Sequence, residues 1–242
     1  MNNYLELSDS QKRVLYSQIL HTTQIPLYNI GGCVVIHGKV DIRLLKTAIQ
    51  EAVLNNDIFR LCLTELDKED GIRAYYAKES LPELPFFDLT ESENLEDMHA
   101  VLRSRMQEEL LKPDKPLFRI RLVKFNEDCY GYLVVMHHII SDGWSFQLLY
   151  REIGSNYEEL LHSGIHSTQP RLSYVDILQR RAGYIGSERY NKDRDFWLKQ
   201  FEGMEFGGRQ QRSRLEAKRK TFRMEGAIAF AIREFCRESA MS

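Results

Sequence analysis

The sequence predicts an α/β fold with layers of helix and strand. Two kinds of segment alternate along the chain: short β-branched runs bounded by glycine or turn residues, and longer runs with apolar residues at helical spacing. The length of 242 residues suits one large domain or two small ones, and such a chain can bury a sizeable core.

The first half of the chain is predicted to contain two helices and three strands. Cap-type residues at 8–10 precede a helix over 11–20, and Asp41 caps a second helix whose apolar positions run from Ile42 to Val53. Between these helices the run 33–36 predicts a short buried strand. Two further runs predict paired strands around a polar turn; they span residues 58–66 and 72–77.

The second half is predicted to begin with a charged amphipathic helix over 94–111. Two strands follow, over 118–125 and 130–138, joined by a turn at 126–128. Gly143 and Trp144 then open a long helix with one apolar stripe, in which we expect Trp144 to lie in the core.

After Pro170 the character of the sequence changes. A helical stretch over 172–200 leads into the basic segment 209–220, which we interpret as a solvated connector, with a grip on nucleic acid or an acidic partner as the alternative. Residues 221–224 and 226–238 then predict a strand and a helix that begin a new unit. Too few elements follow to close a second core.

Composition excludes several classes of protein. The 33 Lys+Arg nearly balance 35 Asp+Glu, giving a formal charge of −2, so we expect no nucleic-acid partner. No apolar run approaches the roughly 18 residues of a membrane span, and the N-terminus is polar, unlike a signal peptide. The four scattered cysteines indicate reduced thiols in a cytoplasmic protein, without a disulfide frame or zinc site; they are Cys33, Cys62, Cys129 and Cys236.

The chemistry is predicted to lie between the last strand and the long helix, where the sequence reads M-H-H-I-I-S-D-G-W-S over 136–145. Adjacent strand residues point to opposite faces, so His137 and His138 cannot both serve one site. We expect His138 at the solvent-reachable end of the strand and His137 inside the protein. This geometry disfavours a metal site, and Asp142 is also a plain helix cap.

Two acyl-transfer families place an Asp shortly after a His. The spacing from His137 to Asp142 is the H-x₄-D of membrane glycerolipid acyltransferases, but no membrane segment or Gly-rich phosphate motif accompanies it. The string H-H-x₃-D-G followed by Trp144-Ser145 resembles the condensation domains of nonribosomal peptide synthetases far more closely.

Three companion motifs strengthen this resemblance. Residues 7–13 are similar to the family's opening L-S-x-A-Q-x-R, with Ser10 in place of Ala. Residues 56–60 stand where the family has H-E-x-L-R and keep an acid and the Arg. Residues 174–176 match the first three positions of the family's Y-x-D-Y motif. The fourth position departs from it, because Ile177 stands where the family has Tyr.

The resemblance implies a chloramphenicol-acetyltransferase-like lobe with a mixed sheet covered by helices. It assigns residues 1–180 to the N-terminal lobe of a condensation domain, and residues 181–242 to a connector and the truncated start of the C-terminal lobe. A complete domain is about twice this length, so we expect the chain to be a fragment that folds but does not catalyse condensation alone. A non-catalytic half-domain that only binds partners is the alternative.

The implied reaction forms an amide between a carrier-bound acyl or peptidyl thioester and a carrier-bound aminoacyl group. The resemblance makes His138 catalytic, either as a base or as a group that orients the amine. It pairs Asp142 with Arg60 in a buried ion pair. His137 has a packing role, Gly143 allows close backbone approach, and Ser145 lines the tunnel or caps the helix.

The implied partners are acyl or peptidyl carrier proteins, an adjacent adenylation domain and, as another donor, an acyl-CoA. No intrinsic cofactor or metal is implied, because substrates travel on the carriers' phosphopantetheine arms. The first motif begins at Leu7, close to Met1, a placement found in starter domains of lipopeptide synthetases. Such a domain acylates the first amino acid with a fatty acyl group. A segment from the interior of a longer chain, or a chain that receives its donor from a separate synthetase, would look the same.

Overall fold

The computed structural model describes residues 4–20, 26–65, 71–78, 81–90, 104, 110, 112, 114–163, 173–204 and 224–239. The chain divides into two compact units, Met1–Tyr190 and Asn191–Ser242. The division falls ten residues after the boundary expected at 180/181, and the assignment of the second part to the start of another lobe stays a prediction.

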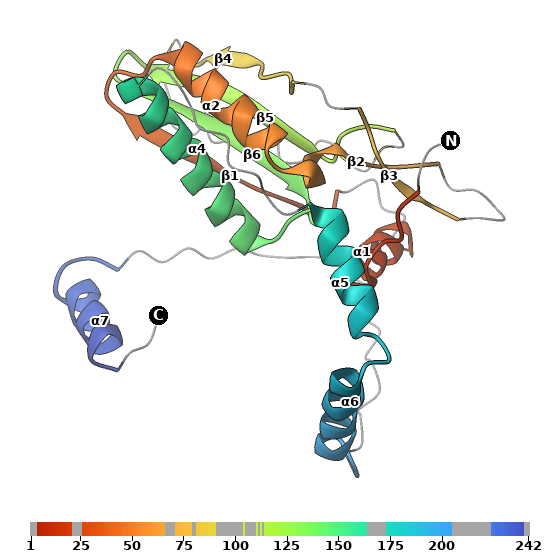
Figure 1. Ribbon diagram of the computed structural model, residues 1–242. Coiled ribbons are helices and arrows are strands. Elements are labelled where there is room, and N and C mark those ends of the chain that lie inside the picture. The colour runs from red at the N-terminus through yellow and green to blue at the C-terminus, as the bar shows by residue number, and fades with distance from the viewer. Residues whose placement is uncertain are drawn as a thin grey trace. The chain divides into compact units, whose positions relative to one another are not determined.

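A four-stranded mixed sheet forms the centre of the first unit, as Figure 1 shows. β1 (Asn29–His37) pairs antiparallel with β6 (Cys129–His137), and β6 pairs antiparallel with β5 (Phe118–Asn126). β4 (Phe86–Asp88), which the pattern did not predict, adds to β5 in parallel. The prediction that the 33–36 run is a buried strand was wrong in one respect. β1 lies at the edge of the four-stranded sheet, with β6 as its neighbour, and its Val35 side chain remains 47% exposed.

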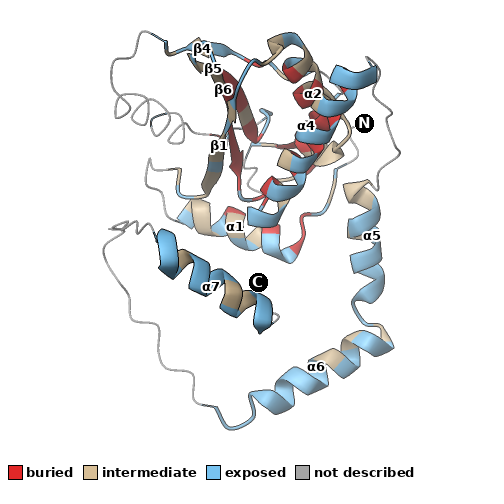
Figure 2. Ribbon diagram, turned by 90° about the vertical axis from the view of Figure 1, so that its left-hand side faces the viewer, coloured by how far each residue is buried: buried red, intermediate tan, exposed pale blue. Residues whose placement is uncertain are grey.

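Two helices cover one face of this sheet. α2 (Ile42–Leu54) and α4 (Gly143–Ser163) lie side by side across it in both views (Figures 1 and 2). Asp41 caps α2 as predicted, because its carboxylate accepts the backbone N–H groups of Arg43 and Leu44. The buried residues of both helices follow the predicted stripes.

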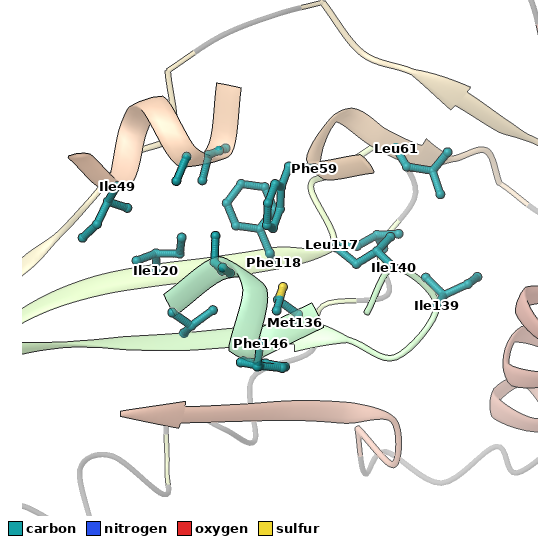
Figure 3. Packing of buried hydrophobic residues seen from close by; sticks show 14 of the residues in the cluster. Ile49, Phe59, Leu61, Leu117, Phe118, Ile120, Met136, Ile139, Ile140 and Phe146 are labelled. Atoms are coloured by element: carbon teal, nitrogen blue, oxygen red, sulfur yellow. The ribbon is translucent and has the colours of Figure 1, made fainter. Parts of the chain in front are cut away.

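The main core fills the space between these helices and the sheet. Figure 3 shows Phe59 and Phe118 in this space. Their rings pack edge to face, with the ring centroids 4.9 Å apart. Ile139 and Ile140, in the loop after β6, belong to the same cluster. The loop after β6, which carries the candidate catalytic residues, is therefore anchored in the core through these two side chains.

The opposite face of the sheet has a smaller cluster. Leu110 packs there with Leu133 and Val135, and all three are at most 2% exposed. The helix predicted over 94–111 lies outside the described residues apart from Ser104 and Leu110. What the described part shows is that an apolar side chain from this segment covers the second face.

The smaller elements flank the sheet. α1 (Asp9–Leu20) begins within the predicted cap residues. The run predicted as a strand over 58–66 opens instead as a 3₁₀ turn, η1 (Asp57–Arg60), and only then becomes β2 (Leu61–Leu63). β2 pairs antiparallel with β3 (Ala74–Tyr76), which confirms the predicted pairing of the two runs.

The C-terminal helices differ from the rest because none has a buried residue. They are α5 (Tyr174–Tyr184), α6 (Glu188–Gln200) and α7 (Gly226–Glu238). The single helical stretch predicted over 172–200 is broken at Gly186, whose φ of 80° only glycine adopts easily. The basic segment 209–220 and most of the strand predicted over 221–224 lie outside the described residues.

The four cysteines are free thiols in the structure. Within the described ranges, no helix has both the length and the apolar character that crossing a membrane would require.

Candidate active site

The two adjacent histidines at the end of β6 face opposite environments. His137 is 1% exposed and lies in the protein, whereas His138 is exposed. Burial lowers the pKa of His137 to about 4, with a smaller contribution from His138, so His137 is neutral at pH 7. The structure therefore places both residues as strand alternation predicted.

Backbone hydrogen bonds from both sides hold this strand end in place. The His137 N–H donates to the carbonyl of Leu117 and the His138 N–H to that of Tyr28, each at 2.8 Å. The Ile140 N–H then returns to the His137 carbonyl at 3.1 Å, which closes a tight turn. Hydrogen bonds to neighbouring segments thus fix the backbone position of His138.

Gln11 is a functional neighbour that sequence reasoning left without a role. Its side chain is 5% exposed, and its Nε2 donates to the carbonyl of Ile139 at 3.0 Å. Its Oε1 accepts the Ser8 N–H at 2.9 Å, so the buried amide is satisfied at both ends. The opening motif therefore holds the loop that follows His138 by a hydrogen bond. The Gln of that motif is the sequence feature from which this contact could have been predicted.

The imidazole of His138 has a defined tautomer in its neutral form. Its Nδ1 lies 2.6 Å from the carbonyl oxygen of Ser141. Because a carbonyl oxygen can only accept, Nδ1 must carry the proton, and the lone pair lies on Nε2. His137 has the opposite arrangement, since its Nδ1 accepts the Ile139 N–H at 3.2 Å.

Asp142 caps α4 and does not pair with Arg60. Its carboxylate accepts the Ser145 N–H at 2.8 Å and the Ser145 hydroxyl at 2.7 Å, and the Ser145 Oγ accepts the Asp142 N–H at 3.2 Å. The hydrogen bonds from the Ser145 N–H and hydroxyl are the main reason that the pKa of Asp142 lies below its usual value. Ser145 is therefore a capping partner, one of its two predicted roles.

The predicted Asp142–Arg60 ion pair was wrong. The guanidinium of Arg60 lies over the Tyr76 ring, 5.5 Å from its centroid, and lines a different cavity from Asp142. The physical reason is that Asp142 is exposed and already satisfied by the first turn of α4. It needs no buried cation.

At this helix start one expectation was wrong and another stays untested. Trp144, predicted to lie in the core, is 64% exposed, because the buried stripe of α4 begins at Phe146. A Cβ at Gly143 would meet nothing within 4 Å, so the fold itself does not require glycine there. A role in close approach to a ligand stays a prediction.

Asp57 links the motif at 56–60 to the one at 174–176, a contact that sequence reasoning missed. Its carboxylate accepts the Ser173 hydroxyl and the Tyr174 N–H, the latter at 3.0 Å, across more than a hundred residues of chain. Ser173 also caps α5, and at the other end of that helix Arg181 pairs with Asp9 of α1. The acid kept at position 57 was the signal, but nothing in the sequence named its partner.

A cavity of about 310 Å³ lies at the end of β6. His138 and Asp142 line it together with Gln11, Ser145 and Tyr174. Ile58 also lines it, so the cavity gathers side chains from four motifs that are far apart in sequence. Among the described residues, no three His, Cys, Asp or Glu side chains come together as metal ligands would.

Comparison with known proteins gives a consistent result. Surfactin synthase subunit 1 of Bacillus subtilis (strain 168) is 33% identical over 209 residues, which are 83% of this chain and 6% of that protein. Tyrocidine synthase 3 of Brevibacillus parabrevis is 29% identical over 204 residues, 83% of this chain and 3% of that protein. The chain thus spans less than a tenth of these curated relatives.

The fold is also found in a solved structure, the starter condensation domain of rhizomide synthetase RzmA. The TM-score is 0.74 at 24% identity, and the match covers 84% of this chain and 49% of that one. The sequence model of the condensation domain matches residues 1–242, the whole chain. The chain therefore belongs to the condensation-domain family.

Proposed function

We propose that this chain supplies the histidine-bearing half of an amide-forming acyltransferase. In the reaction, the free amine of a carrier-bound aminoacyl group attacks the carbonyl of a carrier-bound acyl or peptidyl thioester. The C–N bond forms, the C–S bond breaks, and the donor thiol leaves with a proton. The carrying observation is His138 itself, which is exposed, lines the cavity and has its Nδ1 proton on the Ser141 carbonyl, so that the lone pair is on Nε2.

The reaction requires only weak general-base catalysis from His138. An α-amino group has a pKa of about 8, so an appreciable fraction is already nucleophilic at neutral pH. Nε2 of His138 accepts the proton that the amine loses as the C–N bond forms, and Nδ1 keeps its own proton on the Ser141 carbonyl. The same contact also suits a purely orienting role, in which Nε2 holds the amine by one hydrogen bond.

Stabilisation of the tetrahedral oxyanion is less available from α4 than its position suggests. The N-terminus of a helix favours negative charge because its first N–H groups have no partner within the helix. Here the carboxylate of Asp142 already occupies the Ser145 N–H and carries a negative charge itself. The oxyanion must therefore be stabilised mainly by groups outside this first turn.

The partners follow from the reaction. The donor and acceptor arrive on phosphopantetheine arms of carrier proteins, an adenylation domain loads the acceptor, and an acyl-CoA is a second form of donor. The likeness to a starter condensation domain favours fatty acylation of a first amino acid. In a related solved structure, a variant of that domain is in complex with C8-CoA, at 25% identity and a TM-score of 0.72.

A second candidate is a non-catalytic half-domain that binds carrier proteins only. It is favoured by the size of the His138 cavity. At about 310 Å³ the cavity is near the lower limit for a small-molecule site, and two thioester arms need more enclosed space than that.

The test is single-turnover amide formation from loaded donor and acceptor carriers. It compares this chain with a version extended by the residues that complete a condensation domain. We expect amide only from the extended version, with its loss in the His138→Ala variant and retention in His162→Ala, a change at an exposed histidine of α4. Amide formation by the extended His138→Ala variant at the unchanged rate would refute the catalytic role. Carrier binding without turnover in either version would favour the second candidate.

A further inference from the structure

A second cavity of about 480 Å³ lies apart from His138, where the end of α2, η1 and the start of β5 meet. Its volume falls within the range of roughly 300–1,000 Å³ that small-molecule sites occupy. We call it the basic cavity. It is lined by Val53, Leu54, Phe59, Arg60, Cys62, Ala77, Lys78, Leu81, Pro82, Glu83, Lys115, Pro116, Phe118, Arg119 and Ile120.

The lining is strongly biased in charge. Four cationic side chains line the cavity against one acid, Glu83; the cations are Arg60, Lys78, Lys115 and Arg119. The whole chain has a net charge of −2, so composition does not explain the excess. The cavity beneath α4 has one basic and one acidic residue in its lining, Arg151 and Glu152. The positive charge is therefore concentrated at one place.

The two arginines are held in fixed positions at this cavity. Nη1 of Arg119 donates to the carbonyl of Phe118 at 2.7 Å and to that of Pro116 at 3.1 Å. The guanidinium of Arg60 stacks over Tyr76, and its Nε is buried with no hydrogen-bond partner in the described part of the chain. A buried donor without an acceptor is costly, so this guanidinium has hydrogen-bonding capacity that the described side chains leave unused.

None of the four cations forms an ion pair within the described ranges, although the sequence has acids nearby. Two are half-buried arginines and two are exposed lysines. Arginine binds carboxylate and phosphate oxygens through paired N–H groups, and lysine adds a point charge. The arrangement is suited to one anionic group.

The floor of the cavity is apolar. Phe59, Phe118 and Ile120 belong to the main core, and Leu81 adds an apolar wall that is 60% exposed. A bare inorganic anion would leave the Leu81 side chain in contact with water, whereas an attached hydrocarbon chain would cover it. The ligand that fits both parts has a charged head and an apolar tail.

We propose that the basic cavity binds an amphiphilic anion, a carboxylate or phosphate group attached to a short hydrocarbon chain. The head group would lie among Arg60, Arg119 and the two lysines, and the hydrocarbon chain against Leu81 above the aromatic floor. This site is separate from the His138 cavity and does not rest on the proposed acyl transfer.

The experiment measures binding by isothermal titration calorimetry on the 242-residue chain. The ligands are octanoate, octyl phosphate, the neutral octanol and inorganic phosphate. We expect saturable binding of at least one amphiphilic anion, weakened by added salt, and at least tenfold weaker binding of octanol and of inorganic phosphate. The tighter of the two amphiphiles identifies the head group.

A double variant locates the site. Lys78→Gln with Lys115→Gln should weaken the amphiphile on the order of tenfold, because it removes two charges from the rim. The matched control is Lys39→Gln with Lys46→Gln, two exposed lysines outside this cavity, which makes the same change in net charge. Equal binding of octanol, equal loss in the control, or no saturable binding of either anion would overturn the proposal.

Discussion

The sheet-covering helix α2 and the C-terminal helix α7 have similar amphipathic patterns but differ in how far they are buried. α2 buries Leu45, Ile49 and Ala52 completely or nearly so against the sheet. α7 has an equally regular apolar stripe, yet Ile232 and Phe235 are 45% and 59% exposed. Amphipathic spacing therefore specifies a helix and a face, and burial depends on whether a matching surface is present.

The largest effect should come from the same deletion made in both regions. Ile49→Ala should lower the free energy of unfolding by about 2–5 kcal/mol, because Ile49 is fully buried and the change leaves a cavity. Ile232→Ala in α7 should change it by less than about 0.5 kcal/mol, since its side chain has no buried contact to lose.

Denaturant unfolding measures both variants. A large loss for Ile232→Ala would show that α7 packs on a surface, which would remove the contrast between the two regions.

A second prediction uses the buried histidine of the sheet region. The pKa of His137 is about 4 in the folded chain, below its ordinary value, so the unfolded chain binds the extra proton first as pH falls. Stability should therefore decline between about pH 6.5 and pH 4, by an amount on the order of 3 kcal/mol from this group.

Unfolding curves across that pH range should lose this component in His137→Gln and keep it in His162→Gln, where the side chain is exposed. If His137→Gln leaves the pH dependence as it was, His137 is not buried in the neutral state.

The third prediction concerns the attachment of α5 to the first unit. Asp57→Ala removes a charged acceptor from the Ser173 hydroxyl and the Tyr174 N–H, which should cost about 1.5–3 kcal/mol. Asp57→Asn retains an acceptor oxygen and should cost less. Hydrogen exchange of the amides in the first turn of α5 reports the loss locally, and it should rise more in the Ala variant than in the Asn variant.

The smallest effect should be at the other end of the same helix. Arg181 and Asp9 form an exposed ion pair, and exposed pairs contribute at most about 1 kcal/mol. Arg181→Gln should therefore shift the melting temperature less than Asp57→Ala does. Thermal melts of the two variants at equal salt test the order, and a reversed order would place the main attachment of α5 at its C-terminal end.

Most of the secondary structure could be predicted from the sequence because its signals are local. The cap at Asp41, the period-2 pattern of β5 and the apolar stripe of α4 each depend on residues within a few positions of one another. β4 is three residues long and half exposed, so it left no pattern to detect. Trp144 was misplaced because size and apolarity suggest burial, although its position on the helix decides it.

The site was predictable only in part, for the same reason. Strand alternation placed His137 and His138 correctly, since it acts between neighbours. The partners of Asp57 and Gln11 lie more than a hundred residues away, and no local rule names them. The pairing of Asp142 with Arg60 came from resemblance alone, and the cap formed with Ser145 satisfied the carboxylate first.

The central claim is that the fold presents Nε2 of His138 as a proton acceptor before any substrate binds. The most direct test is the ¹⁵N chemical shifts of the histidine ring nitrogens, measured by NMR at pH 8 and assigned with His137→Gln and His138→Gln variants. The structure predicts opposite tautomers for the adjacent pair, with the proton on Nδ1 in His138 and on Nε2 in His137. A proton on Nε2 of His138 would contradict the account, because that nitrogen could then not accept a proton from the attacking amine.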